Sequence, residues 1–498
     1  MQTPRSKPTF RVRTLGCRVN HAESRELESL LLDRGLHPVA KGNVADLEVV
    51  HTCAVTSQAA AKSRHAIRRA KRGDGTRAPH VLVTGCLVSA DPTTTAALAG
   101  GHDHIAGHRE PEQHMMIERV GQQVDDWLKQ ARVGRDRVAH LATPVSAPTL
   151  ARQVKQVRPL PLLHPPTQPG RHVRAEVRIQ DGCDAHCTFC IIPTLRPTLR
   201  SKTTEDVVEE TTRLVDLGHR EVVLSGIFMG AYGHETALRR KQVNPQHEPL
   251  AELLDAVAQV PGLVRLRLSS LEPGDVTQPL LDAMVANRPV VVPHLHLPLQ
   301  SGSNAILRKM NRQYTVEQYM QMIEAANDAL TDETGLPPAI TTDIICGFPG
   351  ETEADFTQTV ERAQEVGYLH MHVFPFSPRE GTAAARWTDR FVPDAIIKQR
   401  VRSLIDLEED PTDGLAMQWR RRLIGRTLRV LLEQPSDTAS NIMTGRCDHY
   451  DRVHVNTDKP RGAVVRVKIT HACPTHVAGH HIDLAQPLPQ LAGMEYSS

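Results

Sequence analysis

The residues with the most specific chemistry in this sequence are three closely spaced cysteines, Cys183, Cys187 and Cys190. A strand-like run at residues 175–180 precedes them, and Pro193 follows them. Three thiolates on a short loop can bind three irons of a cubane [4Fe–4S] cluster, which usually takes four cysteines. The fourth iron then stays open to a ligand that is not a protein side chain.

Three alternatives stay open at this point: a zinc site, an ordinary ferredoxin-like cluster and a chance spacing of unrelated cysteines. Zinc sites usually combine two C-x2-C pairs or Cys and His pairs, and no second pair follows here. We expect His186 to be a loop residue rather than a ligand. Nine cysteines in 498 residues make a chance triplet rare, and an odd number fits metal ligation in a reducing compartment better than a disulfide framework.

Three further cysteines each follow a predicted strand. Strands at 10–15, 47–52 and 80–85 end at Cys17, Cys53 and Cys86, and helices follow the first two, the second of them at 58–72. Ligands of open parallel sheets bind outside the carboxyl ends of the strands, so the three thiols should converge. Buried core thiols are the alternative, but that alternative does not explain their common position. The pattern therefore predicts a second cluster site on an N-terminal open parallel α/β sheet.

The central part of the chain alternates strands with helices and predicts parallel βα units that form a partial (β/α)6 barrel. The expected strands are 175–180, 221–225, 265–270, 293–298, 340–346 and 369–375, and the expected helices are 204–217, 249–258, 275–286, 315–330 and 352–366. Barrel chemistry takes place at the carboxyl ends of the strands. The residues expected to line a cofactor there are Gly226, Ser269, Glu272, Gln300 and Gly347. Each of these alone also fits a plain βα turn.

The last segment alternates as strands at 428–432, 452–455 and 463–469 and predicts a small β-barrel. Between Arg420 and Asp483 it holds eleven Lys and Arg against six Asp and Glu. A basic β-barrel is a common RNA-binding form, with an ordinary β-domain as the alternative. The expected domains are an N-terminal domain at 8–135, a Pro-rich linker at 136–170, the barrel at 171–405 and the β-domain at 418–485.

The totals restrict the class of protein. No apolar run is long enough to span a membrane, and the N-terminus lacks the apolar core of a secretory signal. The net charge is only +2, so a nucleic-acid partner must be held by local basic patches. The predicted helix 58–72 is such a patch, because it carries Lys62, Arg64, Arg68, Arg69, Lys71 and Arg72 and no acidic residue. A solvated surface face is the alternative interpretation of that helix.

The chain as a whole resembles the methylthiotransferases, a family of radical S-adenosylmethionine (SAM) enzymes, along nearly its whole length. The resemblance is carried by the sequences at 14–20, 52–56 and 84–86, by the loop from Gly182 to Pro193, and by the segments 266–273, 297–303 and 342–351. The form LGCRVN and the segment 372–382 are most similar to the MtaB branch. The C-terminal barrel would then be a TRAM domain.

The resemblance implies an activity and its cofactors. A [4Fe–4S] cluster on Cys183, Cys187 and Cys190 would reduce SAM and produce a 5′-deoxyadenosyl radical, and a second cluster on Cys17, Cys53 and Cys86 would supply sulfur. The product would carry a methylthio group at C2 of N6-threonylcarbamoyladenosine, at position 37 of tRNA. We expect a cytoplasmic, monomeric enzyme that receives electrons from a flavodoxin or ferredoxin. Cys346, Cys447 and Cys473 would be structural.

Other substrates and one other class stay open. Related enzymes act on isopentenyladenosine in tRNA or on an aspartate of a ribosomal protein, and a non-catalytic iron–sulfur RNA-binding protein is the alternative of another class. The sequence departs from the family at Leu87, Thr194 and Pro197. These departures concern substrate contacts rather than the six cysteines.

Overall fold

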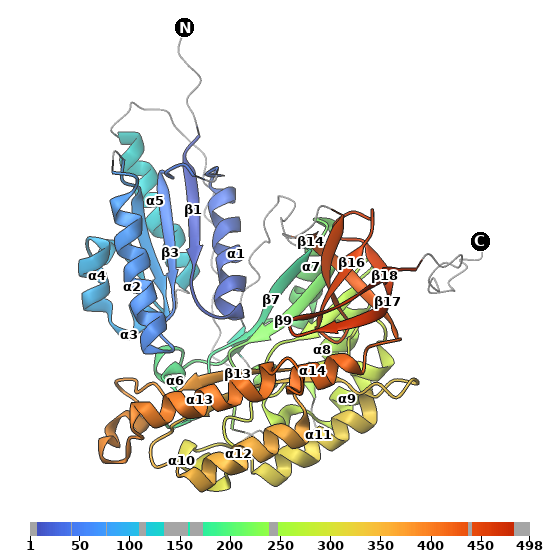
Figure 1. Cartoon of the computed structure of the whole chain (residues 1–498). Helices are drawn as coiled ribbons and strands as arrows, with labels where there is room; N and C mark the ends of the chain where they lie inside the picture. Colours follow the sequence, from blue (N-terminus) through green and yellow to red (C-terminus); the bar gives the residue numbers. More distant parts are fainter. Residues whose placement is uncertain are drawn as a thin grey trace.

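The computed structural model describes residues 7–40, 42–75, 77–108, 116–133, 158–159, 173–238, 248–436 and 441–482. An N-terminal α/β domain and a C-terminal β-barrel stand side by side on a larger central domain (Figure 1). The predicted linker lies outside the described residues, except for β6 (Arg158–Pro159), which pairs with β8 (Arg200–Ser201).

The N-terminal domain is an open parallel sheet, as predicted. Its strand order is β2-β1-β3-β4-β5, from β1 (Thr9–Thr14), β2 (His37–Pro38), β3 (Leu47–Thr52), β4 (His80–Gly85) and β5 (Ile105–Ala106). Helices α1 (Arg18–Asp33) and α5 (Met116–Val133) cover one face, and α2 (Ser57–Arg72) and α4 (Pro92–Ala99) cover the other. The strand order reverses between β1 and β3, and an open sheet binds ligands at such a switch point.

The central domain is the predicted partial barrel of six parallel strands. They are β7 (Arg174–Asp181), β9 (Glu221–Gly226), β10 (Arg265–Leu268), β11 (His294–His296), β12 (Ala339–Cys346) and β13 (His370–Pro375). The helices between them are α7 (Thr204–Asp216), α8 (Pro249–Ala258), α9 (Gln278–Ala286), α11 (Val316–Leu330) and α12 (Glu353–Val366), close to the predicted ranges. Helices α10 (Asn304–Met310), α13 (Asp394–Glu409) and α14 (Leu415–Arg421) were not predicted.

The two faces of the half-barrel differ in polarity. Along each strand, side chains alternate between the helix-covered outer face and the concave inner face. Residues such as Val177, Leu266 and Ile344 belong to the apolar cluster under the helices. The inner face instead carries Arg178, Gln180, Arg265, Arg267, His294, His296, Thr341, Asp343, His370 and His372. The concave face is therefore polar and is not a hydrophobic core.

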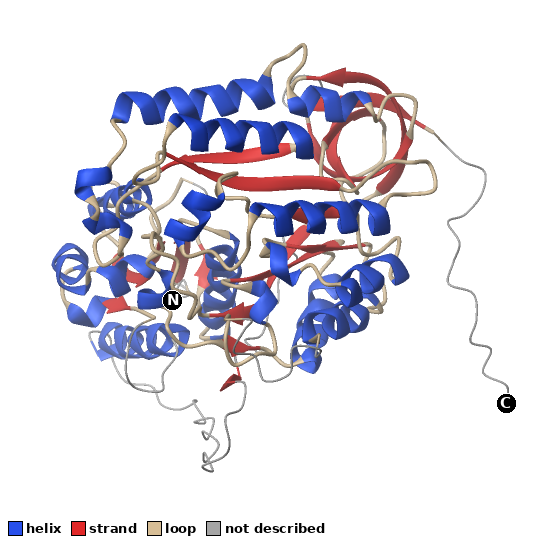
Figure 2. Cartoon of the chain, turned by 90° about the horizontal axis from the view of Figure 1, so that it is seen from below, coloured by secondary structure: helices blue, strands red, loops and turns tan. Residues whose placement is uncertain are grey.

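The C-terminal domain is the predicted small β-barrel, closed in the order β14-β15-β16-β18-β17. Figure 2 looks into this barrel along its length. The strands are β14 (Thr427–Pro435), β15 (Ile442–Cys447), β16 (Arg452–Asn456), β17 (Val464–Cys473) and β18 (His476–His481). Its apolar core continues into Leu336 and Ala339 at the start of β12. The β-barrel thus packs at the amino ends of the half-barrel strands.

A tyrosine of the β-barrel joins all three domains. Tyr450 follows β15 with a φ of 72°, and its ring stacks on His294 of the inner face at 4.5 Å between centroids. Arg18 of the N-terminal domain donates a hydrogen bond to the phenol oxygen at 3.0 Å. Burial would raise the pKa of Tyr450, but Arg18, Arg446 and two further arginines lower it. The inner face is thereby closed at the end nearest the β-barrel.

Candidate functional site: two cysteine triads at a domain interface

The three N-terminal cysteines lie together at the carboxyl edge of the first sheet. Cys17, Cys53 and Cys86 follow β1, β3 and β4. Gly16 precedes Cys17 with a φ of 114°, and a Cβ on it would lie 2.8 Å from the Cβ of Cys53. Any side chain at Gly16 would therefore push the first two cysteine loops apart. The three loops therefore lie at one edge of the sheet, and the binding of one cluster by their thiols stays a prediction.

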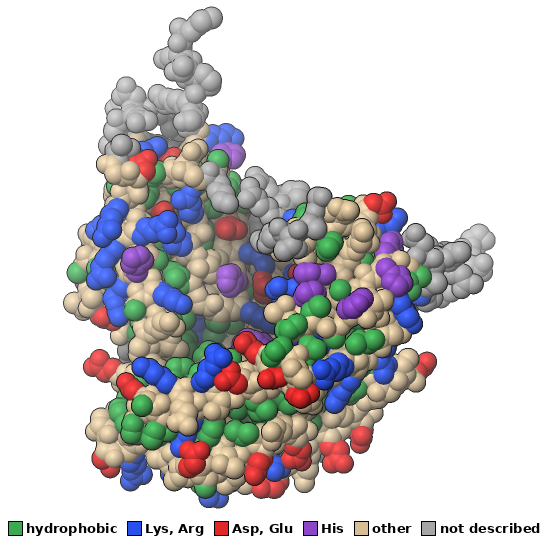
Figure 3. Space-filling view, viewed as in Figure 1, with side chains coloured by type: hydrophobic (Ala, Val, Ile, Leu, Met, Phe, Trp, Pro, Cys, Tyr) green, Lys and Arg blue, Asp and Glu red, His purple; other side chains and the backbone are tan. Residues whose placement is uncertain are grey.

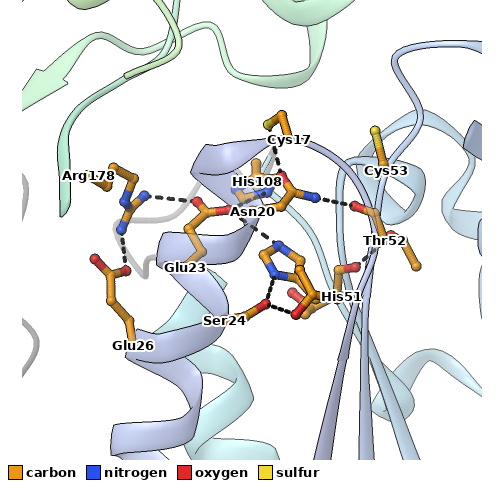
Figure 4. Close-up of polar contacts among 12 residues, drawn as sticks. Cys17, Asn20, Glu23, Ser24, Glu26, His51, Thr52, Cys53, His108 and Arg178 are labelled. Atoms are coloured by element: carbon orange, nitrogen blue, oxygen red, sulfur yellow. Dashed lines mark hydrogen bonds and ion pairs between the residues drawn. The ribbon is translucent and has the colours of Figure 1, made fainter. Parts of the chain in front are cut away.

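Polar side chains fasten these loops to one another. The Asn20 amide donates to the carbonyls of Leu15 at 2.8 Å and Thr52 at 3.1 Å. The Thr52 hydroxyl donates to the Thr84 carbonyl at 2.6 Å and accepts from the Leu87 amide at 3.2 Å. The Asn20 hydrogen bond to the Thr52 carbonyl is drawn in Figure 4. The edge of the sheet is thus a preorganised site and not a set of loose loops.

The second triad lies on a loop that begins at the carboxyl end of β7. Cys183 is buried, and Cys187 and Cys190 are partly exposed. The Cys183 amide donates to the Arg196 carbonyl at 3.0 Å, which closes the loop at its base. Thr188 donates through its amide to Met310 at 3.0 Å and through its hydroxyl to Lys309 at 2.7 Å. The end of α10 therefore holds the middle of the loop.

All six cysteines have free thiols. Burial raises the pKa of Cys86 and of Cys190 to about 12, and it also raises the pKa of Cys53 and Cys183. Among the described residues, the sets with three ligand atoms within 4.8 Å of one another are Glu23–His51–His108 and His296–Asp343–His372, and neither cysteine triad belongs to them. Sulfurs on one tetrahedral zinc lie about 3.8 Å apart, so both triads are spread more widely than one zinc ion needs.

Arg312 is a site residue that the sequence did not reveal. It donates to the Cys187 sulfur at 3.3 Å and forms an ion pair with Glu272, one of the predicted cofactor residues. In the sequence it is an arginine just after α10 with no motif around it. The fold alone brings it to Cys187 and Glu272. Burial opposes its charge, yet Glu272 raises the pKa of Arg312 well above the usual value. A permanent cation therefore lies beside the cysteine loop.

The other predicted cofactor residues lie at or just after strands of the half-barrel, and each has a different local environment. Gln300 has a φ of 60°, and the Ser269 hydroxyl lies 3.7 Å from the Met229 sulfur. A Cβ on Gly226 would lie 3.1 Å from the Gln180 amide oxygen. A Cβ on Gly347 would lie 2.3 Å from Ile397 of α13. Helix packing and a φ of 76° account for that glycine, so its role in cofactor binding stays a prediction.

Apolar packing joins the two cysteine loops. Ile191 follows Cys190 directly, and Leu195 ends α6 (Ile192–Leu195). Both belong to one buried cluster with Cys86 and Leu87 of the N-terminal domain. Leu87, where the sequence departs from the family, therefore packs at the contact between the loops. Of the other departures, Thr194 is partly buried on α6 and Pro197 is exposed.

An ionic network joins the same elements on their polar side. Glu23 of α1 is buried and accepts from Arg178 at 2.9 Å and from Arg196 at 2.8 Å. Arg196 also donates to Asp181, two residues before Cys183, at 2.6 Å. Burial alone would raise the pKa of Glu23, but Arg196, His108 and Arg178 lower it well below the usual value. Figure 4 shows Arg178 bridging Glu23 and Glu26 of α1. We call Glu23, Arg178, Arg196 and Asp181 the interface network.

Two histidines complete the surroundings of Glu23. The Nε2 of His51 lies 3.3 Å from a Glu23 oxygen, and His108 Nε2 lies 2.7 Å from an Arg196 nitrogen. Burial and Arg196 lower the pKa of His108 to about 3, so its imidazole is neutral and can accept from the guanidinium. Two arginines already neutralise Glu23, and a metal ion among them would be repelled. This cluster therefore holds the interface and is not a metal centre.

The chain has many relatives of known class. Residues 177–363 match the radical SAM superfamily, and residues 9–107 match a family described as uncharacterized protein family UPF0004. The MtaB threonylcarbamoyladenosine tRNA methylthiotransferase of Bacillus subtilis (strain 168) is 34% identical over 470 residues, which cover 93% of this chain and 94% of that protein. The chain belongs to the methylthiotransferase family of radical SAM enzymes. Members of this superfamily use SAM with a [4Fe–4S] cluster.

Other relatives in the methylthiotransferase family carry a different substrate in their names. The tRNA-2-methylthio-N(6)-dimethylallyladenosine synthase of Thermobifida fusca (strain YX) is 33% identical, with 94% of this chain and 88% of that protein covered. Among solved structures, the radical SAM methyltransferase TsrM of Kitasatospora setae matches with a TM-score of 0.50 and 14% identity over 87% of this chain and 79% of that chain. That likeness concerns the fold alone. Within the described ranges, each helix is too short or too polar to cross a membrane.

We predict that Glu23→Gln loosens the contact between the two cysteine loops. Removing one partner of a buried ion pair costs about 3–5 kcal/mol, because the other charges stay buried. Hydrogen exchange of the amides at 18–21 and 183–196 should accelerate, while exchange in the β-barrel stays unchanged. Exposed Glu324→Gln on α11 is the matched control and should change neither region.

The same carboxylate gives the contact a pH dependence. The pKa of Glu23 is lowered in the folded protein, so its contribution is complete above its ordinary value of 4.5 and is lost as the pH falls below that value. In Glu23→Gln this acid-dependent part of the exchange should disappear. Equal exchange in both proteins at pH 7 would contradict the assignment.

Proposed function

We propose that this methylthiotransferase adds a methylthio group to C2 of N6-threonylcarbamoyladenosine at position 37 of tRNA. The observation that carries the proposal is the apolar packing of the segment after Cys190 against the Cys86 loop, in a chain of this family. The similarity to MtaB of B. subtilis and the segment 372–382 favour threonylcarbamoyladenosine over isopentenyladenosine.

Cys183, Cys187 and Cys190 are the proposed ligands of the cluster that binds SAM. Cys17, Cys53 and Cys86 are the proposed ligands of a second [4Fe–4S] cluster. The donor sets fit this assignment, because each offers three free thiols on fastened loops, spread more widely than a single ion requires. Gly226, Ser269, Glu272, Gln300 and Gly347 are proposed to lie around SAM, with Arg312 as the cation beside Cys187.

Residues of the chain would determine which atoms a radical formed at this site can attack. The C2–H bond of adenine is not acidic, so acid–base catalysis cannot activate it, and the cluster with SAM supplies a radical that can. Ile191, Leu195 and Leu87 exclude water between the two loops. The interface network holds the two loops against each other, so a substrate carbon activated at one triad would lie near sulfur supplied at the other. Positioning of this kind is a major part of enzymatic rate enhancement.

The tRNA would be held by basic surfaces outside the site. Lys62, Arg68, Arg69, Lys71 and Arg72 of α2 are exposed. Figure 3 shows Lys and Arg side chains over the N-terminal domain and a hollow between that domain and the β-barrel. We propose that the anticodon loop enters this hollow with its base turned out of the stack. A flavodoxin or ferredoxin would supply electrons to a monomeric enzyme in the cytoplasm.

Nucleoside mass spectrometry of tRNA from a deletion strain tests the substrate. We expect the 2-methylthio form of N6-threonylcarbamoyladenosine to disappear and to return with the wild-type gene, but not with Cys183→Ala. Loss of 2-methylthio-isopentenyladenosine, or of a methylthio-aspartate in a ribosomal protein, would identify the other substrates instead. Intact clusters without any 5′-deoxyadenosine from SAM would support the non-catalytic RNA-binding class.

Iron content tests the two cluster sites separately. We expect about eight irons per chain after anaerobic reconstitution and about four in Cys17→Ala. Cys346→Ala is the control, because Cys346 is a buried thiol of β12 within the apolar cluster. A loss of iron in Cys346→Ala equal to that in Cys17→Ala would contradict the assignment.

The basic face of α2 is predicted to contact phosphates. In the double variant Arg68→Ala/Arg72→Ala the affinity for tRNA should fall equally for modified and unmodified RNA. The slope of log K against log salt should decrease by about two, because about one unit is lost for each phosphate contact. Arg402→Ala, an exposed arginine of α13 paired with Asp406, is the control. An unchanged slope would mean that the basic face of α2 contacts solvent and no phosphates.

A further inference from the structure

Three side chains from neighbouring strands meet on the inner face of the half-barrel. Asp343 of β12 is paired with His372 of β13, and His296 of β11 is paired with Thr341, two residues before Asp343. The ligand atoms of His296, Asp343 and His372 lie within 4.8 Å of one another. We call these three residues the polar wall. None of them is needed for the cysteine sites described above.

In the polar wall, His296 is held by hydrogen bonds, while Asp343 and His372 are accessible from the concave side. The Thr341 hydroxyl lies 2.9 Å from Nδ1 of His296, and Nε2 of His296 lies 3.3 Å from a carboxylate oxygen of Asp343. His296 is buried, Asp343 is 28% exposed at its side chain, and His372 is exposed. His296 uses both ring nitrogens in these contacts, so the groups offered to the concave side are the imidazole of His372 and the carboxylate of Asp343.

The wall continues toward the N-terminal cysteines. Phe374 follows His372 on the same face, is 43% exposed, and lies 6.4 Å from the His372 ring between centroids. Ser377, just after β13, bonds Ser57 at the start of α2 through their hydroxyls at 3.0 Å. Ser57 lies four residues after Cys53. A ligand on the wall would thus lie beside the edge that carries the N-terminal triad.

We propose that the polar wall binds the N6 substituent of the target adenosine and that His372 is a specificity-determining residue. This rests on the proposed function. A threonylcarbamoyl group carries a carboxylate, a hydroxyl and a urea, which the imidazole of His372 and the carboxylate of Asp343 can pair with by donating and accepting hydrogen bonds. An isopentenyl group has no polar atom and would leave the wall desolvated without partners. Phe374 offers a face for the adenine ring.

Binding experiments on the full-length, reconstituted protein test this proposal. The probes are two anticodon stem-loops that differ only at position 37, with threonylcarbamoyladenosine or unmodified adenosine. We expect the wild type to bind the modified RNA at least about tenfold more tightly. His372→Leu should reduce this ratio to about one by weakening the modified RNA only. His372→Asn, which keeps a donor and an acceptor, should give an intermediate ratio.

The controls separate recognition from folding. His102→Leu changes an exposed histidine before β5, at the opposite end of the N-terminal sheet, and should leave the ratio unchanged. Iron content in His372→Leu should match the wild type, because none of the six candidate ligand cysteines is changed. If His372→Leu does not fold, Asp343→Asn takes its place and should also lower the ratio.

Two results would overturn the proposal. One is an unchanged binding ratio in His372→Leu and Asp343→Asn. The other is saturable binding of one Co²⁺ per chain that both variants lose, which would make the wall a metal site. The proposed function fails separately, if the wild type methylthiolates isopentenyladenosine and not threonylcarbamoyladenosine. If the wild type acts on threonylcarbamoyladenosine but the variants keep the wild-type binding ratio, only the proposed role of the polar wall is rejected.

Discussion

The buried carboxylate of Glu23 is the interaction on which the arrangement of the site depends. It receives hydrogen bonds from Arg178 and Arg196, which belong to the central domain, while Glu23 lies on the helix whose N-cap is Cys17. Buried ion pairs contribute little net stability compared with apolar contacts of the same size, but breaking one is costly. Such a pair therefore fixes geometry. Here it fixes how the helix after Cys17 sits against the loop that carries Cys183.

The polar inner face of the half-barrel is covered by two other domains, which places both cysteine loops beside an enclosed polar surface. The N-terminal domain lies at the carboxyl ends of the strands, and the β-barrel closes the other end through Tyr450. On the face shown in Figure 3, a hollow lies between these two domains. A substrate base entering there would meet the polar wall, Phe374 and both cysteine loops on a single path. The same enclosure would protect a radical from solvent.

The sequence predicted the elements well and their contacts poorly. The alternation of strand-like and helix-like segments placed the six barrel strands, and the positions of Cys17, Cys53 and Cys86 after strands placed their loops at one edge of the N-terminal sheet. Two β-barrel strands were missed, because β15 contains a glycine and β18 contains a glycine and three histidines where strands usually carry β-branched residues. Helix α13 was also missed, and its contact between Ile397 and Gly347 is known only from the structure.

The interface network and Arg312 lay beyond sequence reasoning for a physical reason. Glu23 and Arg196 lie far apart in the chain, and nothing local marks either as a partner. Arg312 likewise meets Cys187 only through the fold. Charged residues in a sequence are ordinarily surface residues, so burial of these groups becomes visible only in three dimensions.

The central claim is that the two cysteine triads hold two clusters at a fixed, short separation. Electron paramagnetic resonance of the reconstituted, dithionite-reduced protein tests this directly, because two nearby paramagnetic clusters interact through their spins. We predict a spectrum split or broadened by that interaction, which reverts to a single isolated cluster signal in Cys86→Ala. A wild-type spectrum equal to the sum of two independent clusters, or one containing a single cluster, would contradict the account.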